Sequence, residues 1–156
     1  MSENSTHKPD AVALKLWLRL LSCTRLIENA IRSSLREAFD ITLPRFDVMA
    51  QLYRYPDGLR MGEISQLLMV TNGNITGIID QLEQEGLVER TPDASDRRVW
   101  RVQLTRAGVT AFETMADLHK SWVVELTSGL TTDEQQELHA LLLKLRDSLE
   151  EKSRAR

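Results

Sequence analysis

The chain has 156 residues, of which 42% are hydrophobic and 28% are charged, with only seven glycines and four prolines. This length and composition favour one soluble, mostly helical domain with its own apolar core, and they exclude a disordered or fibrous chain. The formal charge of −3 lacks the basic excess that proteins use to neutralise nucleic-acid phosphates, so a nucleic-acid function requires a local concentration of cations.

The cysteine content and the amino-terminal residues bear on location. Cys23 is the single cysteine, so it cannot form an internal disulfide. Residues 1–10 are polar and contain no signal-peptide apolar region, and we expect a disordered tail there. The longest apolar stretch, 11–23, is broken by Lys15 and Arg19 and is shorter than the roughly 20 residues of a membrane span. We therefore expect a cytoplasmic protein with no membrane partner.

Residues 11–39 are expected to form one long helix. Its apolar stripe recurs at steps of three and four and consists of Leu16, Leu20, Cys23, Ile27, Ile31, Leu35 and Ala38. A second apolar set, Leu14, Trp17, Leu18 and Leu21, makes the first half of this helix apolar on more than one side. One small domain has difficulty covering both faces, so either a partner subunit or the chain's own core covers them.

Residues 40–85 predict three short helices. Thr42 and Pro44 begin the first of them, which continues to about Tyr53. The turn at 55–58 precedes an amphipathic helix, in which Glu63 is polar and Ile64, Leu67 and Leu68 are apolar. We place Thr71 at the N-cap of the next helix, which runs to Glu85 and ends at Gly86. The tight join between the last two helices is that of a helix-turn-helix.

Residues 87–150 predict a hairpin and two further helices. Segments 87–90 and 99–104 have strand character and are joined by the polar turn 91–98, which gives a two-stranded wing. Thr105 caps a long helix that ends at Gly129, with an apolar stripe that includes His119. Thr131 and Glu134 form a capping box that opens the last helix, and 151–156 are expected to form a flexible tail. The apolar face of this last helix comprises Leu138, Leu141, Leu142, Leu145 and Leu149.

In a helix-turn-helix the second helix enters the major groove, and its first residues meet the base edges. The candidate contacts therefore lie at the start of the 71–85 helix, on the side away from its isoleucines. Asparagine pairs with adenine, and threonine bonds a phosphate or touches a thymine methyl. Gly73 and Gly77 each cost about 1 kcal/mol of helix propensity, which fits either close approach of the backbone to DNA or tight helix packing.

The segment from Met61 to Glu89 contains no lysine or arginine, so the electrostatic attraction must come from the flanks. Basic residues concentrate between residues 86 and 106, at Arg90, Arg97, Arg98, Arg101 and Arg106. The sequence Asp96-Arg97-Arg98 at the hairpin tip suits an arginine that reaches a minor groove while a carboxylate holds it in place. An ordinary solvated hairpin tip is the alternative.

Two stretches of the chain resemble the MarR family of bacterial regulators. Residues 70–90 look like the recognition helix of that family running into its wing, and 93–98 followed by 102–108 match its wing signature and the start of the next helix. The resemblance covers roughly residues 11–150. It implies a mostly α fold, a winged helix-turn-helix with a two-stranded wing, in which 40–104 form the DNA-binding lobe. Segments 11–39 and 105–150 would form a helical dimerisation region from the N- and C-terminal helices.

The resemblance also implies a function. The expected protein is a homodimer that binds double-stranded DNA at a pseudo-palindrome, with recognition helices about 34 Å apart, as a repressor that a small effector such as an aromatic acid releases. Asp96 would orient Arg98 in the minor groove. The full set of expected DNA contacts is Thr71, Asn72, Gly73, Asn74, Thr76, Gly77, Asp96, Arg97, Arg98 and Arg101. Members of the family often carry a basic residue where Gly77 stands, so base readout here differs.

An effector site is expected where the first, second and post-wing helices of the family meet the DNA-binding lobe. The candidate residues there are Trp17, Arg25, Met49, Tyr53 and Trp122. Peroxide-sensing relatives place a cysteine near the start of the first helix, close to tyrosines. Cys23 lies further along on an apolar stripe in a helix without tyrosine, so we expect a buried structural thiol rather than a redox sensor.

Patterns typical of catalysis are missing from the sequence. His7, His119 and His139 are scattered, and no Cys-x-x-Cys pair, glycine-rich phosphate loop or serine nucleophile elbow occurs. We therefore expect neither an enzyme nor a cofactor or metal site. The main alternative is a winged-helix protein-interaction module without DNA binding, which the acidic composition favours. A cysteine-based redox regulator is a weaker alternative.

Overall fold

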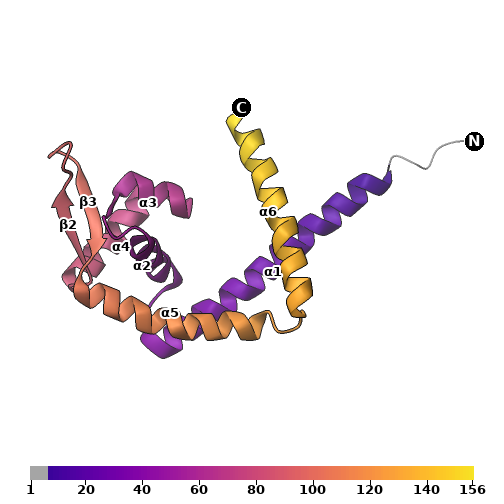
Figure 1. Cartoon of the computed structure of the whole chain (residues 1–156), viewed down its shortest axis with the longest axis horizontal. Helices are drawn as coiled ribbons and strands as arrows, with labels where there is room; N and C mark the ends of the chain where they lie inside the picture. The colour runs from indigo at the N-terminus through magenta and orange to yellow at the C-terminus, as the bar shows by residue number, and fades with distance from the viewer. Residues whose placement is uncertain (1–6) are drawn as a thin grey trace, which may run out of the picture. The chain divides into compact units, whose positions relative to one another are not determined.

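The computed structural model describes residues 7–156, and the chain divides into two compact units, residues 1–119 and 120–156 (Figure 1). Over these described residues the fold is mostly helical with a small antiparallel sheet, as the sequence predicts. Its elements are α1 (His7–Phe39), α2 (Leu43–Arg54), β1 (Leu59–Arg60), α3 (Met61–Leu68), α4 (Asn72–Gln84), β2 (Val88–Pro92), β3 (Trp100–Leu104), α5 (Arg106–Leu126) and α6 (Thr132–Arg154).

Both terminal helices are longer than the sequence analysis expects. α1 begins at His7, so residues 7–10 are helical instead of belonging to a disordered tail, and the first six residues of that expected tail lie outside the described residues. α6 continues to Arg154, so most of the expected flexible tail 151–156 is helical as well. Glu150 pairs with Arg146 at 3.7 Å and with Arg154 at 4.0 Å, each four residues away, which bridges successive turns of this end.

The sheet contains a third strand that the sequence analysis missed. Its order is β1-β3-β2, with both pairings antiparallel. β1 has two residues, too few to show the alternation of apolar and polar side chains that predicts a strand. It follows Gly58, which has a φ of +90°, a backbone conformation that residues other than glycine rarely adopt. β2 and β3 form the predicted wing, which projects from the lobe in Figure 1. Because β1 leads directly into α3, the sheet joins the wing to the helix-turn-helix.

The helix-turn-helix has the predicted boundaries. Thr71 occupies the N-cap position of α4, although its side chain makes no capping hydrogen bond. Gly86, with a φ of +73°, ends this helix and lets the amide of Leu87 donate to the Leu82 carbonyl at 2.9 Å. α3 ends at Met69, which adopts the left-handed conformation with a φ of +54°. The turn between the helices is therefore short and fixed by backbone geometry.

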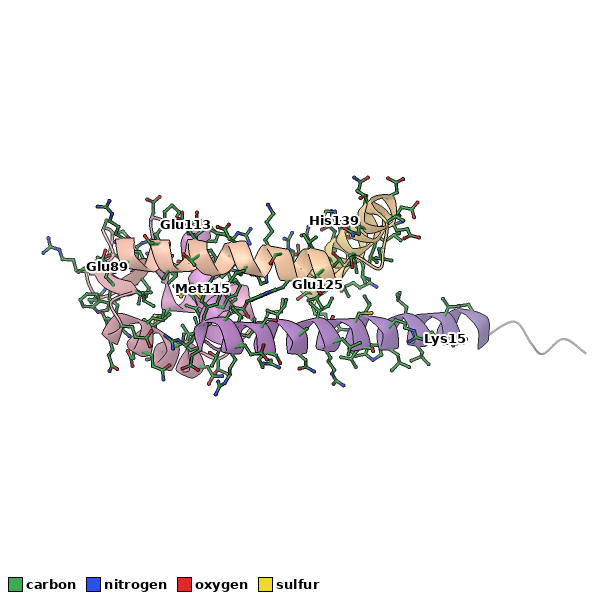
Figure 2. All side chains as sticks on the ribbon, turned by 90° about the horizontal axis from the view of Figure 1, so that it is seen from below. Lys15, Glu89, Glu113, Met115, Glu125 and His139 are labelled. Atoms are coloured by element: carbon green, nitrogen blue, oxygen red, sulfur yellow. The ribbon has the colours of Figure 1, made fainter. Side chains whose placement is uncertain are left out.

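The core lies among α2, α3, α4 and the sheet. Its fully buried members, each no more than 2% exposed, are Leu35, Val48, Met49, Leu52, Ile64, Ile75, Ile79, Leu82, Val88 and Val102. Among the α1 side chains that the structure describes, only Ile31 and Leu35 are buried, and both come from its carboxyl-terminal half. Figure 2 shows the amino-terminal part of α1, around Lys15, extending beyond the lobe.

Cys23 is exposed, so the expectation of a buried thiol is wrong for this chain. Cys23 lies on the predicted apolar stripe of α1, but that stripe continues past the point where the lobe ends. The same holds for Leu16, which is 52% exposed. Helical spacing places residues on one face and leaves open whether anything covers that face.

α5 begins at a close contact with the end of α4. Thr105 caps the helix by accepting a hydrogen bond from the amide of Gly108 at 3.1 Å, and its hydroxyl donates to the Gly86 carbonyl at 2.6 Å. A Cβ atom at Gly108 would overlap the carbonyl oxygen of Leu87, so glycine is required there. Further along, Met115 is buried, and Glu113 accepts a hydrogen bond from Tyr53 of α2. This packing fixes α5 to the base of the wing.

α6 belongs to the second compact unit and has no buried residue. Thr131 and Glu134 form the predicted capping box, with hydrogen bonds of 2.8 and 3.2 Å. Its apolar side chains are nevertheless uncovered, since Leu141 is 64% and Leu149 is 56% exposed. None of the described helices is both long enough and apolar enough to cross a membrane.

Candidate nucleic-acid interface

The first turns of α4 present the predicted recognition residues on one exposed surface. Ile75, Ile79 and Leu82 are buried on the opposite side of this helix and fix its orientation. Asn72 is held against α3 because its amide oxygen accepts a hydrogen bond from the Ser65 hydroxyl. The exposed set is Thr71, Asn72, Gly73, Asn74, Thr76 and Gly77.

Gly73 and Gly77 leave the backbone of α4 open on this surface. A Cβ atom at either position would meet nothing within 4 Å. The alternative that these glycines permit tight helix packing is therefore excluded within the described chain. Their cost in helix propensity is consistent with a backbone that a ligand approaches closely.

The carboxylates in the second half of α4 form ion pairs with arginines of the same lobe. Arg90 of β2 donates to both Asp80 and Glu83, and the bond to Asp80 raises the pKa of the guanidinium above its ordinary value. Arg45 of α2 pairs with Glu85 at the end of the helix. These pairs offset much of the negative charge of α4, and no short-range sequence pattern predicts them.

Asp96 holds Arg98 at the tip of the wing, as the sequence predicts. The guanidinium donates to the Asp96 carboxylate through Nε at 3.1 Å and Nη2 at 3.3 Å, and the Arg98 amide also donates to it at 3.1 Å. These bonds lower the pKa of Asp96. The side chain of Arg98 is 91% exposed, and Arg97 beside it is also exposed. The tip thus presents an arginine that is both oriented and accessible.

Asp93 links the wing to the helix-turn-helix and is only 3% exposed. Its Oδ1 accepts from the Ser95 amide at 2.9 Å and hydroxyl at 2.6 Å, while its Oδ2 accepts from Arg60 at 3.1 Å and Arg101 at 2.8 Å. The bonds from Ser95, together with that from Arg60, hold the pKa of Asp93 well below its ordinary range. No local sequence pattern predicts this role of Asp93, because Arg60 lies 33 residues away in the chain.

Arg101, an expected DNA contact, is 33% exposed and has its guanidinium bonded to partners within the lobe. Its Nε donates to Asp93, and its Nη1 donates to the Gly58 carbonyl at 2.8 Å. A guanidinium with both partners inside the lobe positions the sheet and has little freedom to reach a phosphate. The structure therefore separates Arg101 from the other candidate contact residues.

A cavity of about 680 Å³ lies beside α4, and its location differs from the expected effector site. Its lining residues are Arg32, Arg36, Ile41, Thr42, Leu43, Pro44, Asp47, Val48, Leu68, Val70, Asn74, Ile75 and Ile78. Burial, and then the charge of Glu28, raise the pKa of Asp47 to about 6. The cavity thus combines charged side chains, Arg32 and Arg36 of α1 and Asp47 of α2, with apolar side chains from α2, α3 and α4.

The five residues expected at an effector site do not line this cavity. Met49 is fully buried in the core, while Trp17 is 58% exposed and Arg25 is exposed on α1. Tyr53 donates a hydrogen bond to Glu113 at 2.9 Å and lines a smaller hollow. Trp122 is half-buried on α5 and belongs to the second compact unit.

Comparisons with known proteins agree on one family. The family model described as MarR family matches residues 41–100. The HTH-type transcriptional regulator PapX of Escherichia coli is 37% identical over 143 residues, which cover 89% of this chain and 87% of that protein. A MarR family transcriptional regulator from Silicibacter pomeroyi superimposes with a TM-score of 0.75 at 32% identity, covering 94% of this chain and 99% of that one. A mutant MarR from E. coli, complexed with operator DNA, gives a TM-score of 0.75 at 28% identity, covering 85% of this chain and 94% of that one.

Replacement of Asp93 by asparagine should lower the melting temperature at neutral pH, because Arg60 and Arg101 lose their anionic partner. The folded state depresses the pKa of Asp93, so its ionised form stabilises the fold above the ordinary carboxyl pKa of about 4, and this stabilisation is lost as the pH falls below it. The difference between Asp93→Asn and wild type should therefore shrink on acidification. Thermal denaturation followed by circular dichroism measures it, with Asp57→Asn in an exposed turn as the control. A difference that is constant with pH would contradict the role of the charge.

Proposed function

The chain belongs to the MarR family and is a DNA-binding transcriptional regulator, and we propose that it is a homodimeric repressor of a pseudo-palindromic operator. The observation that carries this proposal is the pairing of two accessible features in one lobe. One is the open first half of α4, and the other is the oriented Arg98 at the wing tip.

Each feature suits a different groove of the duplex. Asn72 and Asn74 carry amides that read adenine in the major groove, and the glycine positions let the helix backbone approach. Arg98 is an exposed cation that Asp96 orients at the hairpin tip, which suits the minor groove. Thr71, Thr76 and Arg97 would bond phosphates, and Asp96 would act by orienting Arg98.

The homodimer follows from apolar surface that the chain leaves exposed. α6 buries none of its leucines, and Leu14, Trp17 and Leu18 on α1 are each at least 58% exposed. Large apolar side chains exposed at helical spacing on one helix are typical of association surfaces in soluble proteins. We assign both helices to the dimer interface, which would present two copies of the lobe to the two halves of an operator.

An effector would act through the cavity beside α4. Arg32 and Arg36 supply cations for a carboxylate, and the aliphatic side chains of Ile41 and Ile78 suit an aromatic ring. Because Asn74 and Ile78 belong to α4, a ligand in this cavity would touch the recognition helix itself. Release of DNA then requires that the ligand bind more tightly to one position of α4 and the operator to another.

Arg98→Ala should weaken DNA binding by about 1 to 3 kcal/mol, which is a factor of about 5 to 150, and should reduce the salt dependence of binding. Fluorescence anisotropy with a duplex that the wild-type protein enriches from a random-sequence pool measures both. Lys15→Ala removes the same charge from α1, outside the lobe, and serves as the control (Figure 2). If the wild-type protein enriches no duplex and its binding does not respond to salt, it is an interaction module and the proposal fails.

Leu141→Glu should weaken self-association because it places a charge within the exposed leucines of α6. Sedimentation velocity at several concentrations should show a shift from dimer towards monomer, with helical content unchanged by circular dichroism. Lys144→Glu on the same helix changes a polar exposed position and should remain dimeric. A wild-type protein that is monomeric at all concentrations would exclude the homodimer.

Benzoate, used as a probe for aromatic acids, should bind more tightly as the pH falls from about 8 to about 6, because protonated Asp47 no longer repels a carboxylate in the same cavity. We expect an increase of about three- to tenfold in affinity by calorimetry, since one pKa unit corresponds to about tenfold. Asp47→Asn should abolish the pH dependence, and Arg36→Gln should weaken binding at every pH. Equal affinity for all three proteins would show that the probe binds elsewhere.

A further inference from the structure

A groove lies between the amino-terminal end of α3 and the wing. Its volume is about 550 Å³, and it is lined by Arg60, Met61, Gly62, Glu63, Gln66, Arg98, Val99 and Trp100. All of these residues belong to the first compact unit. None of them except Arg98 has a role in the function proposed above.

Trp100 forms one wall of this groove and is 50% exposed. It lies on the same face of β3 as Val102, which is fully buried against the lobe, and it pairs with Pro92 in β2. Trp100 therefore extends the inner face of the wing beyond the core. A half-exposed indole in this position offers a flat apolar surface for a partner.

Cations outnumber available anions around the groove. Arg98 is held by Asp96 but is 91% exposed, and Arg60 remains 42% exposed while its Nε bonds Asp93. The single carboxylate of the lining, that of Glu63, is directed at the backbone because it accepts a hydrogen bond from the Arg60 amide at 2.7 Å. Gly62 adds no side chain, and a Cβ atom there would meet nothing within 4 Å. The groove is thus open, apolar on one wall and cationic at its rim.

We propose that this groove seats the sugar–phosphate backbone of the bound duplex, with the Trp100 indole against a deoxyribose and Arg60 beside a neighbouring phosphate. The inference rests on the proposed function, in which α4 lies in the major groove and Arg98 in the adjacent minor groove. One DNA strand separates two adjacent grooves, so its backbone must cross the surface between α4 and the wing tip. Arg98 lines the groove, which makes the groove continuous with that interface.

The dimensions agree with this placement. Two residues of chain span at most about 7 Å, so Trp100 lies within that distance of Arg98 along the backbone. The minor groove is about 6 Å wide, so an arginine within it has the sugars of one wall at a comparable distance. The contact is with the backbone, so it adds affinity without reading sequence.

The test combines affinity, salt dependence and sugar protection in the full-length protein, with the duplex enriched by the wild type. Trp100→Ala should weaken binding about three- to tenfold while leaving the salt slope unchanged, because an apolar contact with sugar releases no counterion. Trp100→Phe should retain most of the affinity. Tyr55→Ala, at a residue of similar exposure outside the groove, should bind as the wild type does. Hydroxyl-radical footprinting should show the loss of protection at the sugars beside the minor-groove contact in Trp100→Ala alone.

A second measurement separates a DNA contact from a structural role. In Trp17→Phe/Trp122→Phe, Trp100 is the single tryptophan, and its quenching by acrylamide should fall when DNA binds. Quenching that is unchanged by DNA, or that falls with protein concentration alone, would overturn the proposal, the latter result by indicating a protein partner. If Arg98→Ala weakens binding while Trp100→Ala does not, the inference fails and the proposed function stands. If neither variant changes the affinity, the wing contact itself is wrong.

Discussion

The Asp93 carboxylate joins the wing to a segment 33 residues earlier in the chain, and the arrangement of the lobe depends on it. It accepts hydrogen bonds from Arg60, which ends β1 at the N-cap of α3, from Ser95 in the wing turn and from Arg101 in β3. A buried carboxylate is costly unless its acceptor sites are filled, and here each oxygen has two donors. The wing is therefore fixed relative to the helix-turn-helix before any ligand arrives, so little entropy is lost when both bind one duplex.

Internal pairing also explains how a chain of net charge −3 presents a surface suited to DNA. Arg90 pairs with both Asp80 and Glu83, and Arg45 pairs with Glu85, so two cations offset most of the charge of these three carboxylates. Arg97 and Arg98 remain exposed at the wing tip. The electrostatic potential at a bound phosphate is set by the charges nearest to it. Charges beyond a Debye length of about 8 Å are largely screened at physiological salt. Net charge is thus a poor guide to this surface.

The sequence predicted those features whose partners lie a few residues apart. The capping box of Thr131 with Glu134, the end of α4 at Gly86 and the pairing of Asp96 with Arg98 all depend on local geometry. The features it missed join distant segments, such as Asp93 with Arg60, 33 residues away, and Arg101 with Gly58, 43 residues away. Arg101 was expected at the DNA surface because its charge is visible in the sequence while its partners are not. The cavity beside α4 was missed for the same reason, because four elements contribute to it.

The two ends of α4 are held by different parts of the lobe, and this determines what a ligand in the cavity would change. Ser65 of α3 holds Asn72 at the first turn, while Arg45 and Arg90 hold the last turns. The cavity meets the helix between these points, at Asn74 and Ile78. The wing is tied through Asp93 to Arg60 at the start of α3, and Arg90 of β2 ties the base of the wing to the last turns of α4. A ligand that tilts the first turns of α4 about this fixed end would move the major-groove contacts while the wing stays in place, and the two could no longer fit one duplex together. The ligand need only prefer the tilted helix by about 3 kcal/mol to lower DNA affinity by about two orders of magnitude.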